Sequence, residues 1–214
     1  MSARPVVAVV DYGAGNLVSI DQALTTVGAE VRIASDAAAL HGVDAVLVPG
    51  VGAAAPAMAR LDRHGLIGPL SAWLAADRPF LGICLGLQLL FEGSDEDGAA
   101  TFGTLPGRTL RLVQAPTLPH IGWNQVNRTR PHPLFDGIED GADFYFIHSY
   151  AGAPSAAAAM TMDDDLVLAR TTHGSPFVSA VGRGAILGVQ FHPERSGRDG
   201  LRLLANFVGM VRVA

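Results

Sequence analysis

The first half of the chain alternates short β-branched apolar runs with segments of helical spacing. The apolar runs occupy 6–13, 30–35, 44–52 and 78–84. Continuous apolar runs of this length are typical of strands buried on both faces. Strands that alternate with helices favour a parallel sheet with right-handed crossovers. This alternation constrains the fold more than any other feature of the sequence.

The segments between and after these runs carry helix signals. Residues 16–28 have helical spacing, with Asn16 as a possible N-cap and Gly28 as a stop. A helical region follows the run at 44–52. The leucine-rich segment 85–93 follows the run at 78–84 without a break, so we predict a helix there.

The second half has a different pattern, with closely spaced strand-like segments and a closing helix at 200–211. "THGSP" between two of the segments predicts a hairpin turn. The alanine cluster 156–159 and the acidic run 163–165 are expected to be loop and solvated surface. The predicted strands are 109–113, 143–150, 166–172, 176–182 and 185–192. We therefore expect one α/β domain over 1–214: an open, mostly parallel, flavodoxin-like sheet flanked by helices, with additional antiparallel strands.

Composition excludes several classes of function. Hydrophobic residues make up 49% and the net charge is −5, so the chain is globular and has no basic face for nucleic acid. There is no lysine for a Schiff base, and one cysteine provides neither an internal disulfide nor a cysteine metal cluster. The N-terminus shows no signal-peptide pattern, and no apolar segment is long enough to span a bilayer. We expect a cytoplasmic protein with no membrane contact, no metal and no cofactor.

The lone cysteine lies between two glycines, in Gly82-Ile83-Cys84-Leu85-Gly86. This is the G-x-nucleophile-x-G pattern of a nucleophile elbow, with sulfur in place of oxygen. A tight turn from strand to helix brings the neighbours of the nucleophile too close for side chains, which requires the glycines. Free N–H groups and the dipole at the helix start favour a thiolate. A buried structural cysteine is the less favoured alternative.

A cysteine nucleophile usually needs a base, and the base needs an orienting group. Among the seven histidines, His192 ends a strand-like run, at the sheet edge where parallel-sheet sites form. Glu194, two residues later, is placed to hold the imidazole of His192 in the correct tautomer. A capped surface loop would show the same "HPE" residues. His41, His64, His132 and His173 have polar or turn-like surroundings that favour solvated loops, while His120 and His148 stay unassigned.

Acyl-transfer chemistry also needs donors for the developing oxyanion, and backbone N–H groups serve best. The amide of Leu85, directly after Cys84, is one candidate. The turn "PGVG" at 49–52, with Val51 at its centre, follows a neighbouring strand and is the second. An ordinary strand-ending turn would show the same residues.

Together these motifs resemble the class I, or triad, glutamine amidotransferases. "PGVG", "GICLGLQLL" and "GVQFHPE" occur in that order. The resemblance identifies Cys84 with the nucleophile, His192 with the base and Glu194 with the third triad member. "DYGAGNLVSI", "PHIGWN", "FIHSY" and "QFHPERSG" further resemble the glutaminase subunits of imidazole glycerol phosphate synthase, across essentially the whole chain. One departure is Ala54, where an aromatic is common in these subunits.

The resemblance implies the substrate and interface residues. Gln88, one helical turn beyond Cys84, is expected to face the pocket and bind glutamine. Glu96 is expected to meet the substrate ammonium, although Asp95, Asp97 and Glu92 compete for that role. For Trp123, a half-buried core aromatic is an equally weighted alternative to an interface residue. The other implied substrate contacts are Gly52, Ser149 and Tyr150, and the implied partner contacts are Asn16, Trp123, Tyr145 and Arg195.

The resemblance also implies a reaction and a partner. The subunit hydrolyses L-glutamine to glutamate and ammonia through a thioester, without a cofactor. The ammonia passes to a (β/α)8-barrel cyclase subunit, in a heterodimer of histidine biosynthesis. Three alternatives remain at this point: the glutaminase subunit of another synthase, against which "PHIGWN" argues; a catalytically silent scaffold, against which the intact triad argues; and a free-standing cysteine protease, which would not need the interface motifs.

Overall fold

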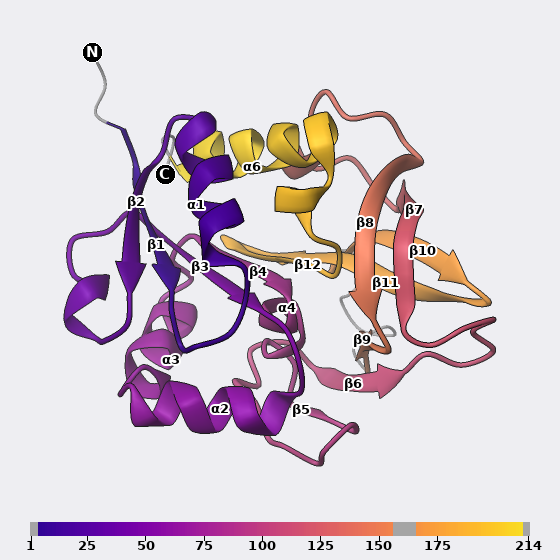
Figure 1. The fold of residues 1–214 in the computed structure, drawn as a ribbon, viewed down its shortest axis with the longest axis horizontal. Coiled ribbons are helices and arrows are strands. Elements are labelled where there is room, and N and C mark those ends of the chain that lie inside the picture. The colour runs from indigo at the N-terminus through magenta and orange to yellow at the C-terminus, as the bar shows by residue number, and fades with distance from the viewer. Residues whose placement is uncertain (1–3, 156–165, 212–214) are drawn as a thin grey trace.

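A sheet of nine strands forms the centre of the computed structural model, which describes residues 4–155 and 166–211. Its strand order is β2-β1-β3-β4-β12-β11-β10-β7-β8, and β5, β6 and β9 form a second, three-stranded sheet (Figure 1). The strands are β1 Val6–Val10, β2 Glu30–Ala34, β3 Ala45–Gly50, β4 Phe80–Cys84, β5 Gly93–Ser94, β6 Gly107–Arg111, β7 His120–Arg128, β8 Ala142–His148, β9 Tyr150–Pro154, β10 Val167–His173, β11 Ser175–Arg183 and β12 Ile186–Val189. The α-helices are α1 Leu17–Thr26, α2 Ala54–Arg63, α3 Ile67–Ala75, α4 Leu85–Gln88 and α6 Gly197–Val211, with 3-10 turns η1 Ala38–Leu40, η2 Pro133–Phe135 and η3 Pro193–Arg195.

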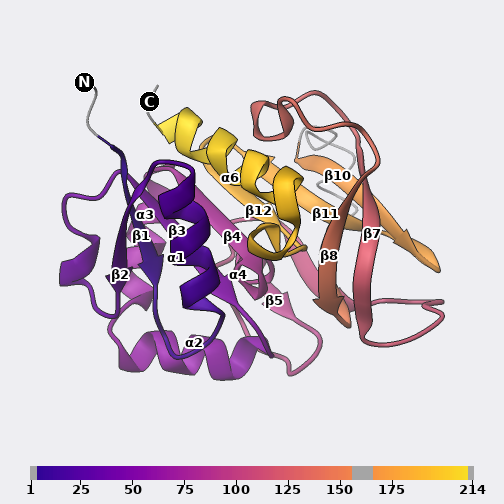
Figure 2. The ribbon, with the colours of Figure 1, turned by 45° about the horizontal axis from the view of Figure 1, so that its top comes forward.

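The strands β2, β1, β3, β4 and β12 are parallel, and helices cover both of their faces. Helices α1 and α6 lie side by side on one face, with α2 and α3 on the other (Figures 1 and 2). Successive side chains of a strand point to opposite faces. Val7 and Val9 therefore enter the core under α1 and α6, while Ala8 and Val10 enter the core against α2 and α3. This double burial explains the continuous apolar runs and confirms the predicted parallel core.

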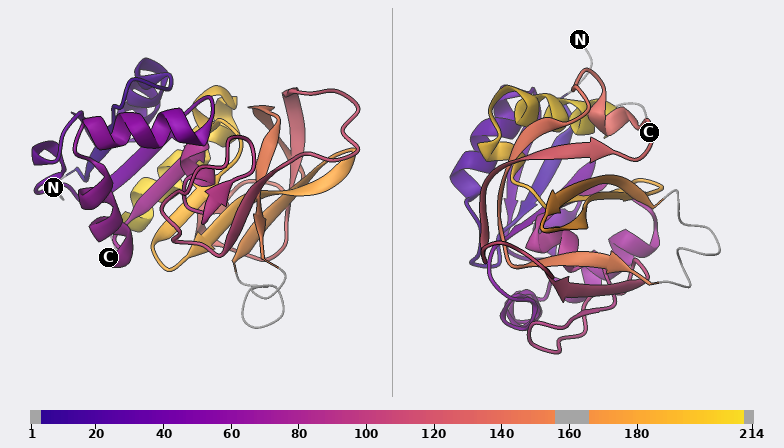
Figure 3. Two further views of the ribbon diagram at one scale, coloured as in Figure 1. Left: turned by 90° about the horizontal axis from the view of Figure 1, so that it is seen from below. Right: turned by 90° about the vertical axis from the view of Figure 1, so that its right-hand side faces the viewer.

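The strands β11, β10, β7 and β8 extend the sheet in antiparallel pairing beyond β12. Figure 3 shows the helix-flanked parallel strands at one end of the molecule and these strands at the other. The hairpin predicted at "THGSP" is present, with Gly174 at φ +80° between β10 and β11. The α1 start is also as predicted, since Asn16 accepts a hydrogen bond from the Ser19 amide. Among the described residues, no helix is both long enough and apolar enough to cross a bilayer.

The predicted helix over 85–93 is wrong beyond its first turn, because α4 ends at Gln88. Residues after α4 pair with a distant segment instead. The carbonyls of Leu89, Leu90 and Phe91 accept hydrogen bonds from the amides of Phe102, Leu105 and Gly103 at 2.8–3.0 Å. In the structure, this pairing with a distant segment takes the place of the i+4 bonds that a longer helix would make. The leucines that follow Gln88 therefore belong to a buried turn and not to a helix.

The predicted single strand over 143–150 is divided into two. Strand β8 ends at His148 in the large sheet, and β9 begins at Tyr150 in the small one. Ser149 is left at the change of sheet. Strand β7, over "HIGWNQVNR", was not predicted, although it pairs with β8 along its length. The segments 156–159 and 163–165, predicted as loop and solvated surface, lie outside the described residues.

Candidate active site

Cys84 lies where β4 becomes α4, in a sharp turn. Its φ of 55° and ψ of −107° place a non-glycine residue in a conformation that costs energy. A Cβ built on Gly82 would lie 2.5 Å from the carbonyl of Gly86, and one built on Gly86 would overlap the Val48 carbonyl. Both glycines are thus required for close approach of backbone, as the sequence predicted. Since α4 has only four residues, the dipole at its start is small, which weakens the contribution that the sequence predicted for the helix.

A Gly86→Ala substitution tests the fit of this turn. We expect the free energy of unfolding to fall by about 3 kcal/mol or more, because the added methyl meets backbone that cannot move aside. Chemical denaturation monitored by circular dichroism measures the change. Gly68→Ala in α3 is the matched control: its Cβ would have no neighbour within 4 Å, so it should be neutral or slightly stabilising. Equal unfolding curves for the two variants would contradict the prediction.

His192 follows β12 and lies beside Glu194 at the start of the η3 turn. Its Nδ1 is 2.8 Å from Oε1 of Glu194, and both side chains are buried. Because a carboxylate only accepts, Nδ1 carries the hydrogen. Nε2 is buried and makes no hydrogen bond within the described part of the chain. It is the nitrogen that is free to exchange a proton with Cys84.

The charge state of His192 depends on these two neighbours. Burial lowers the pKa of His192, but Cys84 and then Glu194 outweigh burial and raise it above the ordinary value. Both groups favour the charged imidazole. The turn that carries His192 is tied to β8, since its amide donates to the Tyr145 carbonyl at 2.9 Å.

A cavity of about 250 Å³ opens beside Cys84. It is smaller than the roughly 300–1,000 Å³ typical of drug-sized ligands, so it suits a molecule the size of an amino acid. All five residues predicted to contact substrate line it, together with the nucleophile. The lining is Val51, Gly52, Cys84, Gln88, Glu96, Pro119, Ile147, His148, Ser149 and Tyr150.

Glu96 is the acidic residue that reaches this cavity. Its three predicted competitors are engaged elsewhere: Asp95 pairs with Arg108 at 2.6 Å, Asp97 accepts from the Ala55 amide at 2.6 Å, and Glu92 accepts from the Gly107 amide at 3.0 Å. Partial burial, followed by the adjacent Asp97 carboxylate, raises the pKa of Glu96. The positive charge of an ammonium group bound there would counteract both effects by favouring the ionised carboxylate.

Gln88 lines this cavity, as predicted, and its side-chain amide is already hydrogen-bonded within the protein. Its Nε2 donates to the Tyr150 carbonyl at 2.9 Å and to Oε1 of Gln190 at 3.1 Å. Both amide hydrogens are therefore used within the protein, which leaves its carbonyl oxygen for a ligand. Nε2 of Gln190 lies 3.5 Å from the sulfur of Cys84. Sequence reasoning missed Gln190, although a glutamine at the end of the apolar run before His192 was the available signal. Its side chain is fully buried in the structure.

The turn "PGVG" ends β3 directly opposite Cys84, since Gly50 and Cys84 are partners in the parallel ladder. The hydroxyl of Tyr12 donates to the Pro49 carbonyl at 2.9 Å and fixes the start of the turn. Gly52 has a φ of +89°, and a Cβ there would meet nothing within 4 Å. Val51 between them is 50% exposed. Val51 thus follows the ladder partner of Cys84, and Leu85 follows Cys84 itself. Their roles as oxyanion donors stay a prediction.

Three of the predicted interface residues form one cluster, in which Arg195 lies over the Tyr145 ring and the Trp123 ring meets that ring edge-on. The Arg195 guanidinium lies 4.2 Å from the ring centre of Tyr145, whose ring meets that of Trp123 at 6.2 Å. Trp123 is 57% exposed, so it is not the core aromatic of the alternative prediction. Asn16 lines a cavity of about 100 Å³ with His192, Glu194 and Arg195. The four residues therefore surround the His192 side of the site.

Other histidines fall into two groups. His41 and His64 are exposed, as predicted. The prediction of a solvated loop is wrong for His173, because it ends β10 and stacks on the buried His120 at 4.1 Å. His132 is half-buried and accepts a hydrogen bond from the Leu134 amide. His173 is shielded from solvent by a residue distant in sequence, and His132 is held by a hydrogen bond within its own turn.

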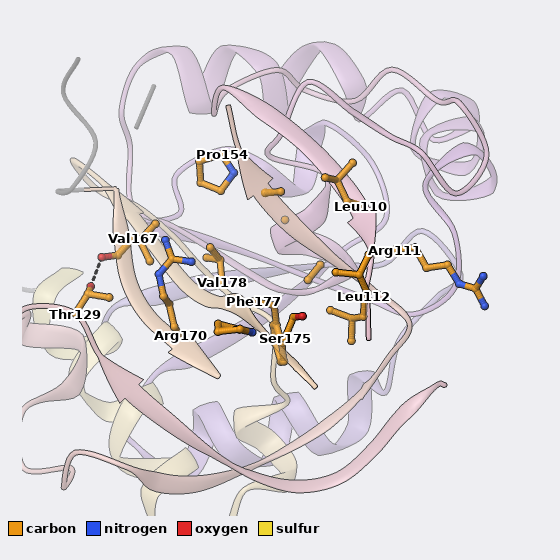
Figure 4. A pocket seen from close by; sticks show the side chains of 15 residues that line it. Leu110, Arg111, Leu112, Thr129, Pro154, Val167, Arg170, Ser175, Phe177 and Val178 are labelled. Atoms are coloured by element: carbon orange, nitrogen blue, oxygen red, sulfur yellow. Dashed lines mark hydrogen bonds between the residues drawn. The ribbon is translucent and has the colours of Figure 1, made fainter. Parts of the chain in front are cut away.

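A larger cavity, of about 390 Å³, lies between the β6–β9 pair and the strands β10 and β11 (Figure 4). Its lining is mainly apolar, including Leu110, Leu112, Phe177 and Val178. The hydroxyl of Thr129 donates to the Val167 carbonyl at its edge. It contains neither a thiol nor an imidazole, so size alone does not make it the catalytic site.

Comparisons with known proteins show the family of the chain. The family model described as glutamine amidotransferase class-I matches residues 8–210. A relative from Moorella thermoacetica, named imidazole glycerol phosphate synthase subunit HisH, is 44% identical over 212 residues, 99% of this chain and 97% of its own. A protein of the same name from Synechococcus elongatus is 46% identical over 220 residues, 100% and 97% of the two chains. The solved structure of PurLQS from Thermotoga maritima has a TM-score of 0.73 at 19% identity, covering 97% of this chain and 99% of that one, which shows the shared fold alone.

Proposed function

The chain belongs to the class I glutamine amidotransferase family, and within it to the HisH subunits of imidazole glycerol phosphate synthase; from this premise we propose that it hydrolyses L-glutamine to glutamate and ammonia at Cys84. The ammonia serves a partner subunit of the synthase, in histidine biosynthesis. The observation that carries the proposal is the strained Cys84 turn, beside the His192–Glu194 pair and a cavity of amino-acid size.

In the proposed reaction, the Cys84 thiolate attacks the side-chain amide carbon of glutamine. The negative charge that develops on the amide oxygen is stabilised by the N–H groups of Leu85 and Val51. His192 gives its Nε2 proton to the departing nitrogen, so ammonia leaves and a thioester remains. His192 then takes a proton from water, which attacks the thioester and releases glutamate. Glu194 keeps the imidazole in the required tautomer through both steps.

In this scheme the substrate is held at the other end of the cavity. Glu96 meets the α-ammonium of glutamine, and the backbone of Gly52, Ser149 and Tyr150 meets the carboxylate and amide. Gln88 offers its carbonyl oxygen, because both of its amide hydrogens are already used. The support for these roles is that all five residues line one cavity with Cys84.

The partner in this proposal is a (β/α)8-barrel cyclase subunit that forms a heterodimer with this chain. The Trp123–Tyr145–Arg195 cluster and Asn16 offer it one surface on the His192 side of the site. Val18, Ile121 and Ile147 add exposed apolar side chains. Exposed apolar area of this kind is typical of a protein interface rather than of a free surface.

A glutaminase assay with and without the cyclase partner tests the proposed function. Glutamate release from glutamine, dependent on Cys84 and raised by the partner, is the expected result. Absence of glutamine hydrolysis in both states would overturn the proposal, and peptide cleavage by the chain alone would favour a protease. Stimulation by the partner of a different synthase would place the chain in another pathway.

Control of the reaction is proposed to lie in the Val51 amide. In the isolated subunit this amide faces away from the site, and docking of the cyclase with its nucleotide bound shifts the turn to the competent form. Gly50 and Gly52 allow more than one orientation of the peptide groups around Val51. Loss of one oxyanion donor lowers the rate by roughly 10²–10³. Full activity in the isolated subunit would contradict this mechanism.

Val51→Pro removes the amide hydrogen and should abolish partner stimulation. We expect glutamine turnover in the complex to fall by about 10²–10³ relative to wild type. Val51→Ala, which keeps the amide and removes only the side chain, is the matched control and should retain most of the stimulation. Steady-state glutamate release, measured for the subunit, the complex and the complex with nucleotide, gives the comparison. A folded, complexed Val51→Pro variant with wild-type stimulation would exclude Val51 as the donor.

A further inference from the structure

Three histidines outside the triad gather where β7, β8 and β10 meet. His120 on β7 and His148 on β8 are cross-strand partners, and only 3% and 6% of their surfaces are exposed. The His120 ring stacks on His173 at 4.1 Å and on Phe146 at 5.0 Å. The catalytic scheme uses none of the three histidines. His148 nevertheless lines the cavity beside Cys84.

A metal site does not fit this cluster. Within the described ranges, no group of three or more histidine, cysteine or acidic residues is arranged to hold a metal ion. Both ring nitrogens of His120 and of His148 already have hydrogen-bond partners. His173 points its Nε2 at the Thr117 carbonyl, 2.9 Å away. The nitrogens are thus committed to partners within the protein.

The hydrogen-bond partners fix the tautomers of both buried rings. Nδ1 of His148 lies 2.8 Å from the Tyr150 carbonyl, which can only accept, so this nitrogen carries the hydrogen. Nε2 of a neutral His148 then accepts from Nδ1 of His120 at 3.2 Å. Nε2 of His120 in turn accepts from the Asn124 amide at 3.1 Å. The three hydrogen bonds therefore all point the same way, from the Asn124 amide through both imidazole rings to the Tyr150 carbonyl.

Both rings are neutral at pH 7. Burial is the main cause that lowers the pKa of His148, the bond to Tyr150 opposes it, and the neighbouring histidines add to it, with a net pKa of about 3. Burial, followed by the neighbouring His173, lowers the pKa of His120 to about 4. A second proton would break the chain, because each Nε2 is needed as an acceptor.

The carbonyl at the end of this chain belongs to the wall of the substrate cavity. Tyr150 begins β9 directly after Ser149, where the polypeptide leaves the large sheet. The same carbonyl also accepts from Nε2 of Gln88 at 2.9 Å. Gln88 donates further to Gln190, whose amide lies 3.5 Å from the sulfur of Cys84. A continuous set of hydrogen bonds thus joins Asn124 on β7 to the nucleophile.

We propose that His148, held in its tautomer by His120, is a positioning residue that fixes the Ser149–Tyr150 backbone and Gln88 for glutamine binding. This inference rests on the proposed glutaminase function. When the hydrogen bond from His148 is lost, the Tyr150 carbonyl can rotate. The Gln88 side chain, which donates to the same carbonyl, then moves with it. Displacement of a binding group by about 1 Å can lower the rate about 100-fold. Because the displaced groups bind substrate rather than react, the effect appears in KM and less in kcat.

Two substitutions at one position separate the two bonds of His148. In His148→Asn, the amide nitrogen takes the place of Nδ1 and can still donate to Tyr150. In His148→Gln, the amide takes the place of Nε2 and can still meet His120, but the side chain at position 148 no longer donates to the Tyr150 carbonyl, which keeps only the bond from Gln88. We expect the KM for glutamine, measured in the complex with the partner, to stay within about threefold of wild type for His148→Asn and to rise about tenfold or more for His148→Gln. His132→Asn, whose hydrogen bond lies within its own turn, is the control and should leave KM unchanged.

The outcomes distinguish this inference from the proposed function. A wild-type complex without glutaminase activity would count against the proposed function. An active wild type with equal KM values for the two His148 variants would overturn the positioning role alone. If His148→Gln does not fold, nitrogen NMR of the imidazoles in wild-type protein at pH 7 still decides. Neutral Nδ1–H rings at His148 and His120 support the chain, whereas Nε2–H or protonated rings overturn it.

Discussion

Cys84→Ser should abolish glutamine hydrolysis, with a fall in turnover of about four orders of magnitude or more. A serine hydroxyl in this turn does not form the stabilised anion that a thiol forms beside an imidazole. Serine is slightly smaller than cysteine and fits the same backbone, so the elbow between Gly82 and Gly86 should remain folded. The loss is therefore chemical rather than structural.

The matched measurement is synthesis supported by added ammonia. In the proposed complex the second reaction takes place on the partner, so Cys84→Ser should still form product when ammonia replaces glutamine. Glutamate release and ammonia-supported product formation are measured on the same preparation. Near-normal glutamine turnover in the variant would show that Cys84 is structural and would remove the basis of the proposed mechanism.

His192→Asn should lower turnover by about three to four orders of magnitude, and Glu194→Ala by less. Nε2 of His192 is the nitrogen left free for proton exchange, and asparagine has no equivalent base there. Its amide can still donate to Glu194 at the Nδ1 position, so the buried carboxylate keeps a partner. The η3 turn should also remain, because the Ser196 hydroxyl that donates to the His192 carbonyl is unaffected.

Turnover at saturating glutamine separates this role from the roles of the other buried histidines. A fall in kcat is expected for His192→Asn, whereas His148→Gln should raise KM. Glu194→Gln, which keeps the size and removes the charge, is the control for the effect of the carboxylate on the imidazolium. An active His192→Asn variant, together with an equal or larger loss at another histidine, would move the base elsewhere.

Local steric requirements made the elbow predictable. Two glycines at fixed spacing around Cys84 are needed wherever a strand turns this sharply into a helix, because backbone occupies the space of a Cβ. The parallel core was predictable for a similar reason, since strands buried on both faces must be continuously apolar. The hairpin at Gly174 and the Asn16 cap also depend only on nearby residues.

The length of α4 and the division of 143–150 into two strands were not predictable. The leucines after Gln88 are compatible with a helix, but their carbonyls pair with residues 102–105, and no local pattern reveals that choice. Ser149 lies at the change of sheet because β8 and β9 pair with different, distant strands. These are cases in which long-range hydrogen bonding overrides local propensity.

The sequence by itself determined the parallel core, the strained cysteine turn and the residue types for a thiol–imidazole–carboxylate site. It did so because periodicity and steric exclusion act over a few residues. Only the tertiary structure decided which groups meet: Glu96 rather than its acidic neighbours, Gln190 beside Cys84, and the chain from Asn124 to Tyr150. Those contacts join strands far apart in sequence, and burial makes each unpaired polar atom costly, so the pairing is set by topology.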